Sequence, residues 1–360
     1  MLKMPPVVKP ADIEFEAERL LTETLHDVPF IMGCQIQRHV RLGRSELDLV
    51  ATIQVGETQH RIVCEVKGNG QPRFAREACL HLRHLVTGNE YPVFIAPFVS
   101  PEASAICSEL GVRFIDLEGN CRLTFNGVYI QRTGYRSPST TRRELRSLYS
   151  PKAERVLRVL VSTGPRRWKT QELADEAQVS LGQIANVKKL LADREWIDSD
   201  ESGFGLRSFD RAVLPLLNQW AANYRLSKST SADFYSMGSI PETESKLAEV
   251  AAEQRTNFAF TVFSGAARFQ PTVRYQRVSA YYLGDVMLLA DRAGLKQVNT
   301  GANVVLLSPY DEGVLYGGRD VDQSPVVSPV QLYLDLQETK GRGEEAANTI
   351  LDQVIAPIWR

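Results

Sequence analysis

The sequence lacks any apolar run near the ~20 residues that a membrane-spanning helix needs. Residues 1–10 also lack the apolar stretch of a secretory signal. These absences predict a cytoplasmic protein with no membrane contact. Cysteine is scarce: five residues, an odd number with no Cys-x-x-Cys pair, argue against a disulfide framework and a structural zinc site. The 360 residues are long enough for two or three domains.

Neither sign of charge predominates over the whole chain, since the formal net charge is only −1. The charges are segregated, however. Between Arg132 and Lys169 the chain carries 11 Lys and Arg residues against only Glu144 and Glu154. Such a basic belt in a near-neutral protein indicates local contact with a polyanion. The alternative is a solvated linker.

One hairpin near the N-terminus could gather three charged side chains. Residues 46–54 and 60–67 alternate as strands, and Gly56 suits the first central position of a tight turn between them. This register sets Asp48 opposite Glu65, and period-2 alternation puts Lys67 on the face of Glu65. We therefore predict that Asp48 and Glu65 hold Mg²⁺ or Mn²⁺, while Lys67 orients a water or stabilises charge at a phosphate. The alternative is a surface strand whose charges are solvated.

The surrounding elements are predicted in the order α-β-β-β-α-β. The helices are expected at residues 11–26 and 72–86, and the outer strands at 34–42 and 91–97. This order, with Asp48 and the Glu65-x-Lys67 motif, resembles the PD-(D/E)XK (restriction-endonuclease-like) nuclease superfamily. The resemblance implies such a domain over residues 1–136.

The resemblance also bears on further residues. A first-helix glutamate often joins the metal site in that family, and Glu14 is the best placed here, with Glu18 as the competing choice. Where some members carry glutamine or tyrosine on the second helix, this chain offers Arg76, His81 and His84. His81 and His84 share a helix face and could ligate a metal, although histidines that merely lie on a helix surface are commoner.

A second domain is expected over residues 150–225, after a basic linker at 137–149. Helices are predicted near 151–162, 171–178 and 180–194, the third opened by the capping box Ser180-Leu-Gly-Gln183. Residues 195–208 then indicate a two-stranded wing. This plan resembles the winged helix-turn-helix of many bacterial regulators.

On the third helix, Gln183, Asn186 and Lys189 follow each other at three-residue spacing, away from a buried apolar stripe. Glutamine and asparagine can pair with adenine, and lysine can reach guanine or phosphate. Arginine and lysine before the second helix and on the wing could contact phosphates. The residues predicted to bind DNA are Ser180, Gln183, Asn186, Lys189, Arg207, Arg166, Arg167 and Lys169. The alternative is a winged helix that contacts protein.

Residues 230–360 are predicted to form a third domain, with helices at 242–254 and 285–293 and strands at 258–263, 278–283 and 304–307. The strand followed by Ser264-Gly265 resembles a nucleotidyltransferase-like fold. Active members carry an Asp-x-Asp on the following strand, where this chain has no carboxylate before Asp285. Two-metal chemistry would lack its ligands, so we expect a non-catalytic α/β domain that serves as a sensor, docking platform or fold support.

The whole chain is thus expected to be a multi-domain α/β protein. Residues 91–101, 116–120, 300–311 and 328–336, together with the winged helix, resemble antitoxins of type IV abortive-infection toxin–antitoxin systems. That resemblance implies a repressor that binds double-stranded DNA, opposes a cognate toxin and could act as a homodimer. The alternative hypothesis is a Mg²⁺-dependent DNA endonuclease that uses Asp48, Glu65 and Lys67 with help from Glu14.

Overall fold

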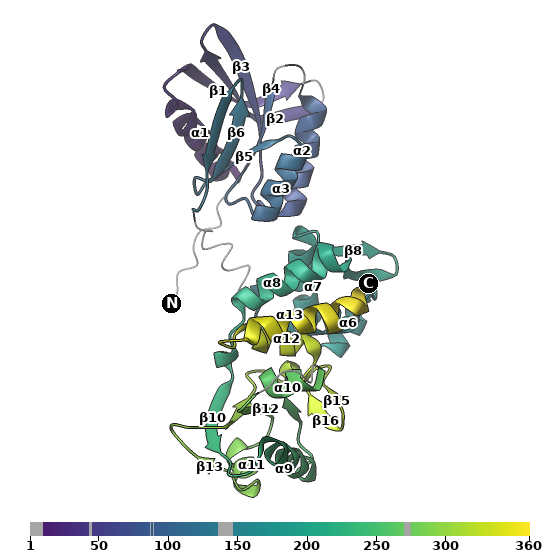
Figure 1. Cartoon of the computed structure of the whole chain (residues 1–360). Helices are drawn as coiled ribbons and strands as arrows, with labels where there is room; N and C mark the ends of the chain where they lie inside the picture. Colours follow the sequence, from purple (N-terminus) through teal and green to yellow (C-terminus); the bar gives the residue numbers. More distant parts are fainter. Residues whose placement is uncertain (1–9, 43–44, 87, 89, 136–146, 270–274) are drawn as a thin grey trace, which may run out of the picture. The chain divides into compact units, whose positions relative to one another are not determined.

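The computed structural model describes residues 10–42, 45–86, 88, 90–135, 147–269 and 275–360. The chain divides into two compact units, one of residues 1–144 with 192–195 and the other of 145–191 with 196–360 (Figure 1). Most of the expected linker, residues 137–146, lies outside the described residues. The regions 150–225 and 230–360, expected as separate domains, fall in one unit.

The first unit is built on a seven-stranded sheet in which the strands neighbour each other in chain order, β1 to β7. β3–β4 and β4–β5 are parallel pairs, and the remaining pairs are antiparallel. The elements are α1 (Pro10–His26), β1 (Ile31–Leu42), β2 (Ser45–Val55), β3 (Thr58–Val66), α2 (Pro72–Leu85), β4 (Glu90–Ala96), α3 (Pro101–Glu109), β5 (Arg113–Asp116), β6 (Cys121–Phe125) and β7 (Val128–Arg132). The predicted α-β-β-β-α-β order is confirmed.

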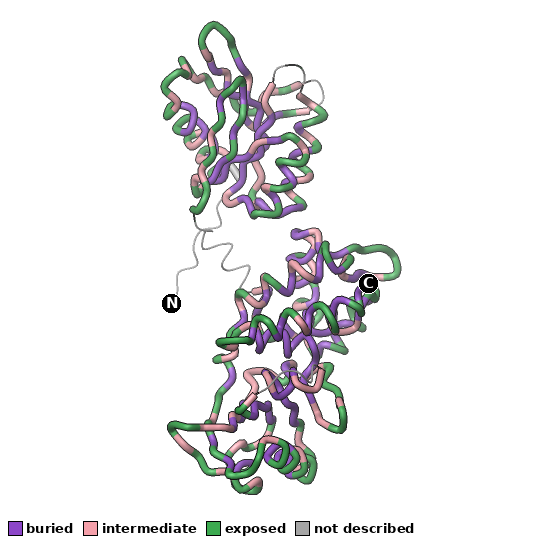
Figure 2. The backbone as a smooth tube through the Cα atoms, viewed as in Figure 1, coloured by how far each residue is buried: buried purple, intermediate pink, exposed green. Residues whose placement is uncertain are grey.

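Helices cover both faces of this sheet (Figure 1). On one face, Ala17, Leu21 and Leu25 of α1 pack against apolar side chains of the central strands. On the other face, α2 and α3 bury a stripe that includes Ala78 and Leu82 of α2. Figure 2 shows the buried backbone concentrated along the central strands.

The predicted hairpin register is confirmed from Val55–Thr58 to Leu49–Cys64. Gly56, at the turn, has a φ of +59°, a backbone conformation that glycine adopts at little cost. The prediction of a strand as far as Lys67 is slightly too long, because β3 ends at Val66. The hairpin nevertheless brings Asp48 and Glu65 to the same end of β2 and β3.

The second unit begins with three helices and a hairpin at the predicted positions. These are α5 (Pro151–Ser162), α6 (Thr170–Glu176), α7 (Leu181–Asp193), β8 (Ile197–Asp200) and β9 (Gly203–Leu206). Trp168 extends the hairpin, since its backbone exchanges two hydrogen bonds with Phe204. Gly203 permits this approach: a Cβ there would lie 2.3 Å from the Trp168 carbonyl oxygen.

The chain then continues through a π-helical turn (Phe209–Val213), α8 (Leu214–Asn223) and a short 3-10 helix (Leu226–Lys228) into a second seven-stranded sheet, with strand order β13-β10-β14-β12-β11-β16-β15. Its strands are β10 (Thr230–Tyr235), β11 (Phe258–Phe260), β12 (Val278–Tyr282), β13 (Lys296–Gln297), β14 (Val304–Ser308), β15 (Arg319–Val321) and β16 (Ser324–Val326). Its helices are α9 (Ile240–Glu253), α10 (Val262–Phe269), α11 (Val286–Arg292), a 3-10 turn (Glu312–Leu315), α12 (Pro329–Gln337), α13 (Gly343–Ile350), a π-helical turn (Leu351–Ile355) and α14 (Ala356–Trp359).

Two features differ from expectation here. The strand expected at 258–263 ends at Phe260, because Val262 takes a φ of +51° and opens α10. α12 is buried on every side from Pro329 to Leu336 and packs against α5, α10 and α13. A helix enclosed in this way belongs to a protein interior, so α12 holds the two predicted domains of this unit together. Among the described residues, no helix combines the length and apolarity needed to cross a bilayer.

Candidate functional site

The carboxylate of Glu65 lies buried between two basic side chains. Lys67 Nζ lies 2.9 Å from Glu65 Oε1, and His81 Nδ1 lies 3.0 Å from Glu65 Oε2. Only 7% of the Glu65 side chain is exposed, so these two partners replace its lost hydration. Burial opposes the charge on Lys67, but the hydrogen bond to Glu65 and nearby carboxylates outweigh it and raise the pKa of Lys67. Glu65 and Lys67 therefore lie together as predicted.

Asp48 lies at the same end of the hairpin. Its Oδ2 accepts a hydrogen bond from the backbone N–H of Val66 at 2.6 Å. Burial raises the pKa of Asp48, and the negative charges of Glu65 and Glu14 raise it further. An opposite charge placed among these carboxylates would be stabilised by all three.

The contacts of Glu14 and Glu18 show which of these two α1 glutamates lies nearer to Asp48. Glu14 faces His39, with 3.4 Å between Glu14 Oε2 and His39 Nε2, and its charge acts on Asp48. Glu18 instead pairs with Arg38 of β1. Glu14 is thus the α1 glutamate directed to the hairpin.

The donor set suits a hard cation, since Mg²⁺ is commonly held by one or two carboxylates and completes its octahedron with water. Asp48 and Glu65 supply such oxygens. In the described part of the chain, however, no group of three or more His, Cys, Asp and Glu side chains is arranged to hold a metal ion. Any cation bound here would keep most of its ligands as water or substrate oxygens.

His81 is the residue of this site that the sequence analysis left undecided. Its partner in that analysis, His84, is exposed on α2 and has no contact with Glu65 among the contacts of the described residues. The sequence does contain a sign that His81 faces the sheet. His81 directly precedes Leu82 in the buried stripe of α2, and that stripe packs on the sheet face of Val63. A polar residue beside such a stripe lies at the edge of the helix–sheet interface, where His81 contacts Glu65.

The predicted DNA-contacting residues of α7 do not share one exposed face. Lys189 and Ser180 are exposed, whereas Gln183 and Asn186 are half-buried. Asn186 Nδ2 donates to Ser147 Oγ at 2.9 Å, and Gln183 Nε2 is buried. Ser180 Oγ accepts the backbone N–H of Gln183 at 3.2 Å, which completes half of the expected capping box. DNA contact by Gln183, Asn186 and Lys189 stays a prediction, and of the three only Lys189 is fully exposed.

The predicted arginines, of which Arg166 and Arg167 are exposed and Arg207 is half-buried, all pair with carboxylates. Arg207 Nε lies 2.8 Å from Asp198 Oδ1 across the hairpin, and Arg167 Nε lies 3.1 Å from Asp200 Oδ2. Arg166 pairs with Glu172 and lies over the ring of Trp168. Lys169 is exposed and has no ion-pair partner among the described residues. The lysines thus carry the uncompensated positive charge.

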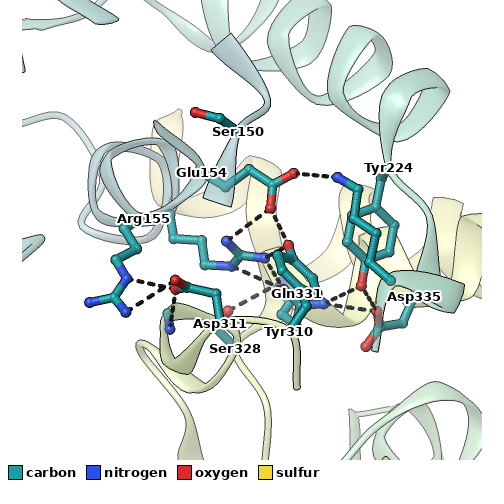
Figure 3. Close-up of polar contacts among 12 residues, drawn as sticks. Ser150, Glu154, Arg155, Tyr224, Tyr310, Asp311, Ser328, Gln331 and Asp335 are labelled. Atoms are coloured by element: carbon teal, nitrogen blue, oxygen red, sulfur yellow. Dashed lines mark hydrogen bonds and ion pairs between the residues drawn. The ribbon is translucent and has the colours of Figure 1, made fainter. Parts of the chain in front are cut away.

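A second cluster of charged groups is buried between α5 and α12 (Figure 3). Arg158 donates from Nε and Nη2 to Gln331 Oε1 at 3.0 and 2.7 Å, and from Nη2 to the Tyr310 hydroxyl at 3.0 Å. Glu154 receives Lys228 Nζ at 3.3 Å. At the edge of the cluster, Arg155 pairs with both carboxylate oxygens of Asp311, at 2.6 and 3.1 Å.

Asp335 continues this network on α12. Its Oδ1 accepts hydrogen bonds from Tyr224, Gln331 and Tyr281, and its Oδ2 accepts one from Thr261. Burial raises the pKa of Asp335 to about 6, although the four donors oppose the shift. Because the cluster is enclosed and its groups mostly bind each other, its role is to join elements.

Comparison with known proteins gives one family match. Residues 212–356 match a family model described as a transcriptional regulator, AbiEi antitoxin, of a type IV toxin–antitoxin system. No curated protein matches the chain.

Two solved structures show a weak likeness. One is a repair endonuclease from Pyrococcus abyssi, with 14% identity, a TM-score of 0.23, and coverage of 32% of this chain and 48% of that one. This chain thus spans about half the length of that enzyme. The other is a protein of unknown function, with 15% identity, a TM-score of 0.22, and coverage of 51% and 94%. These scores are too low to establish a shared fold.

Proposed function

We propose that the chain is a DNA-binding regulator of the antitoxin type, in which residues 150–225 form a winged helix-turn-helix. The observation that carries this proposal is the match of residues 212–356 to a family of transcriptional regulators. Three helices and a hairpin precede that region in the same compact unit. The partners of this function are double-stranded DNA and a cognate toxin, and the chain acts in the cytoplasm, as a homodimer where its DNA site is palindromic.

The test is binding to duplex DNA taken from upstream of the coding sequence, followed by fluorescence anisotropy across salt concentrations. Lys189→Ala is expected to weaken binding and to lower the slope of log affinity against log salt by about 1, because one phosphate contact is lost. Lys296→Ala, which removes an exposed lysine from β13, is the control and is expected to leave both unchanged. A wild-type protein that binds no duplex would contradict the proposal.

The C-terminal region 230–360, which we propose to be nucleotidyltransferase-like, is given a docking or sensing role rather than a catalytic one. β12 carries no carboxylate, and the next one, Asp285, caps α11 by accepting the N–H groups of Met287 and Leu288. A cavity of about 760 Å³ lies between α9 and the β15–β16 hairpin. The charged pair at its wall, Glu244 with Arg268, is internally satisfied at 2.6 Å.

A second function is favoured by one specific observation, the convergence of Asp48, Glu65 and Lys67 at one end of the β2–β3 hairpin. We infer a PD-(D/E)XK-like domain in residues 1–136 that cleaves DNA with Mg²⁺ or Mn²⁺. Asp48 and Glu65 would hold the ion, which supplies a more acidic water and charge stabilisation. Lys67 would position that water, and Glu14 would add negative charge.

This second function is tested by incubating supercoiled plasmid with the protein and either metal. Asp48→Asn, Glu65→Gln and Lys67→Met are each expected to abolish cleavage, as is EDTA. Glu57→Gln alters an exposed carboxylate at the turn of the same hairpin and is expected to cleave normally. Intact plasmid with wild-type protein, or cleavage that survives all three site variants, would eliminate it.

A further inference from the structure

The exposed face of α7 is mainly apolar, whereas the sequence suggested a face of polar side chains. Leu181, Gly182, Ala185 and Lys189 are exposed along it, with 48% of Leu181 accessible. A Cβ at Gly182 would meet nothing closer than Ser180 Oγ at 3.9 Å, so the first turn of the helix is open. The face is therefore apolar and small at its N-terminal end and cationic further along.

The amide side chains that could read adenine are turned away from this face. Asn186 is committed to Ser147 at 2.9 Å, and Gln183 is half-buried with its Nε2 inside the protein. Direct reading of a base by these two residues would require them to leave those positions. Leu181 and Ala185, one turn apart, already point outward.

The charge of this region favours a polyanion as the occupant of the face. Lys189 on α7 and Lys169 just before α6 are exposed, and neither has a carboxylate at ion-pair distance within the described residues. Lys188, the neighbour of Lys189, lies over the Phe204 ring with Nζ 4.7 Å from the ring centre. An apolar strip that continues into Lys189 fits the major groove, where thymine presents a methyl group and the backbone presents phosphates.

We propose that α7 reads thymine methyl groups by apolar contact through Leu181 and Ala185, while Lys169 and Lys189 contact flanking phosphates. This inference rests on the proposed function as a DNA-binding regulator and names the base chemistry that its recognition helix selects. Thymine-rich steps in the site are recognised through the 5-methyl group, and hydrogen bonds from Gln183 and Asn186 contribute nothing to the choice of base.

The experiment compares two versions of one duplex. A duplex is selected with the full-length protein from a random-sequence library and then synthesised with either thymidine or 2′-deoxyuridine, which removes only the methyl groups. Wild-type protein is expected to bind the uracil duplex more weakly, by about three- to four-fold for each contacted methyl group.

The protein variants test whether the thymine preference comes from contact with Leu181 or from a change in DNA shape on loss of the methyl groups. In Leu181→Ala the preference for thymine over uracil is expected to shrink, while in Met237→Ala, which truncates a residue 83% exposed elsewhere in the same unit, it is expected to persist. Unchanged thermal unfolding of both variants confirms that they fold.

The possible results are distinguishable. Equal binding of the two duplexes by wild-type protein, or a thymine preference that Leu181→Ala retains in full, overturns the inference but leaves DNA binding intact. Failure of wild-type protein to bind any library duplex overturns the proposed function and this inference together.

Discussion

Both oxygens of the Glu65 carboxylate are engaged, one by Lys67 and the other by His81. A cation at Glu65 would displace or share one of these contacts. Because an ionised carboxylate only accepts hydrogen bonds, His81 Nδ1 must be the donor. A donor that holds a ligating carboxylate in one orientation raises metal affinity, since the site loses less freedom on binding.

We therefore expect His81→Ala to weaken Mn²⁺ binding about ten-fold. His81→Asn, whose side-chain N–H can take the place of Nδ1–H, is expected to bind nearly as well as wild type. Isothermal titration calorimetry with Mn²⁺ measures both, and His84→Ala on the exposed side of α2 is the matched control. Equal affinity in wild type and His81→Ala would show that His81 only fills space beside Glu65.

Asp335 makes the stability of the second unit depend on pH. Its pKa rises from 3.8 to about 6 on folding because burial disfavours the charged form. The folded state therefore holds the proton more tightly, and the resulting stabilisation is complete below pH 3.8 and is lost as the pH rises to about 6. Because a tenfold change in proton affinity corresponds to about 1.4 kcal/mol, the loss is about 3 kcal/mol.

The comparison is wild type against Asp335→Asn in urea unfolding from pH 4 to 7. All four tryptophans lie in the second unit, so their fluorescence follows this unit within the intact chain. Wild type is expected to lose about 3 kcal/mol more than the variant over this range. Parallel curves for the two proteins would mean that Asp335 titrates alike in the folded and unfolded states.

At the scale of elements, the β8–β9 hairpin places carboxylates against two arginines, one that follows β9 and one that precedes α6. Asp198 and Asp200 of β8 pair with Arg207 and Arg167, so phosphates must compete with carboxylates for these cations. Exposed pairs of this kind contribute about 0–1 kcal/mol to stability, so their loss costs little folding energy. Under the proposed function, their main effect is on the positive charge that is available to DNA phosphates.

We expect Asp198→Asn to strengthen duplex binding and to steepen its salt dependence by about one unit of slope, because Arg207 becomes available for a phosphate. Anisotropy titrations at several salt concentrations measure this. Asp291→Asn on α11 changes the net charge equally and is expected to have little effect. An identical gain in both variants would point to a general charge effect instead of a released Arg207.

The sequence was most informative where pattern and turn chemistry agree. In the β2–β3 hairpin, alternation and Gly56 defined the register that pairs Leu49 with Cys64. On α7 the spacing of polar residues was misleading, because Asn186 is covered by Ser147, which lies 39 positions earlier in the chain. Helical spacing defines a face, but only distant contacts decide whether that face meets solvent.

The same limit applies to α12. The helix begins after Ser328, whose Oγ accepts the Gln331 N–H at 3.2 Å. That Gln331 would meet Arg158, 173 positions earlier, could not follow from either segment. The sequence therefore predicted residues 150–225 and 230–360 as separate domains, whereas the structure joins them in one compact unit.

At the scale of the molecule, this junction predicts that residues 145–360 fold as one cooperative unit. A fragment of residues 145–225 would lack α12, so Arg158 would lose Gln331 and Tyr310, and the apolar surface under Leu332 would be exposed. The fragment would also lack Asp311, the partner of the largely buried Arg155. Breaking a buried charged pair alone costs about 3–5 kcal/mol, a large share of the ~5–15 kcal/mol that stabilises a domain.

The expected outcome is a single thermal transition for the 145–360 fragment and no cooperative transition for the 145–225 fragment, both followed by tryptophan fluorescence and circular dichroism. Both fragments keep Trp168, Trp196 and Trp220, so they can be compared with the same probe. If the shorter fragment melted cooperatively at the same temperature as the longer one, residues 145–225 would fold without α12, and α12 would not be part of a core that the two regions share. In that case the region that we propose to bind DNA could change its position relative to the C-terminal sheet, and a toxin docked on that sheet, as proposed, would not be rigidly connected to α7.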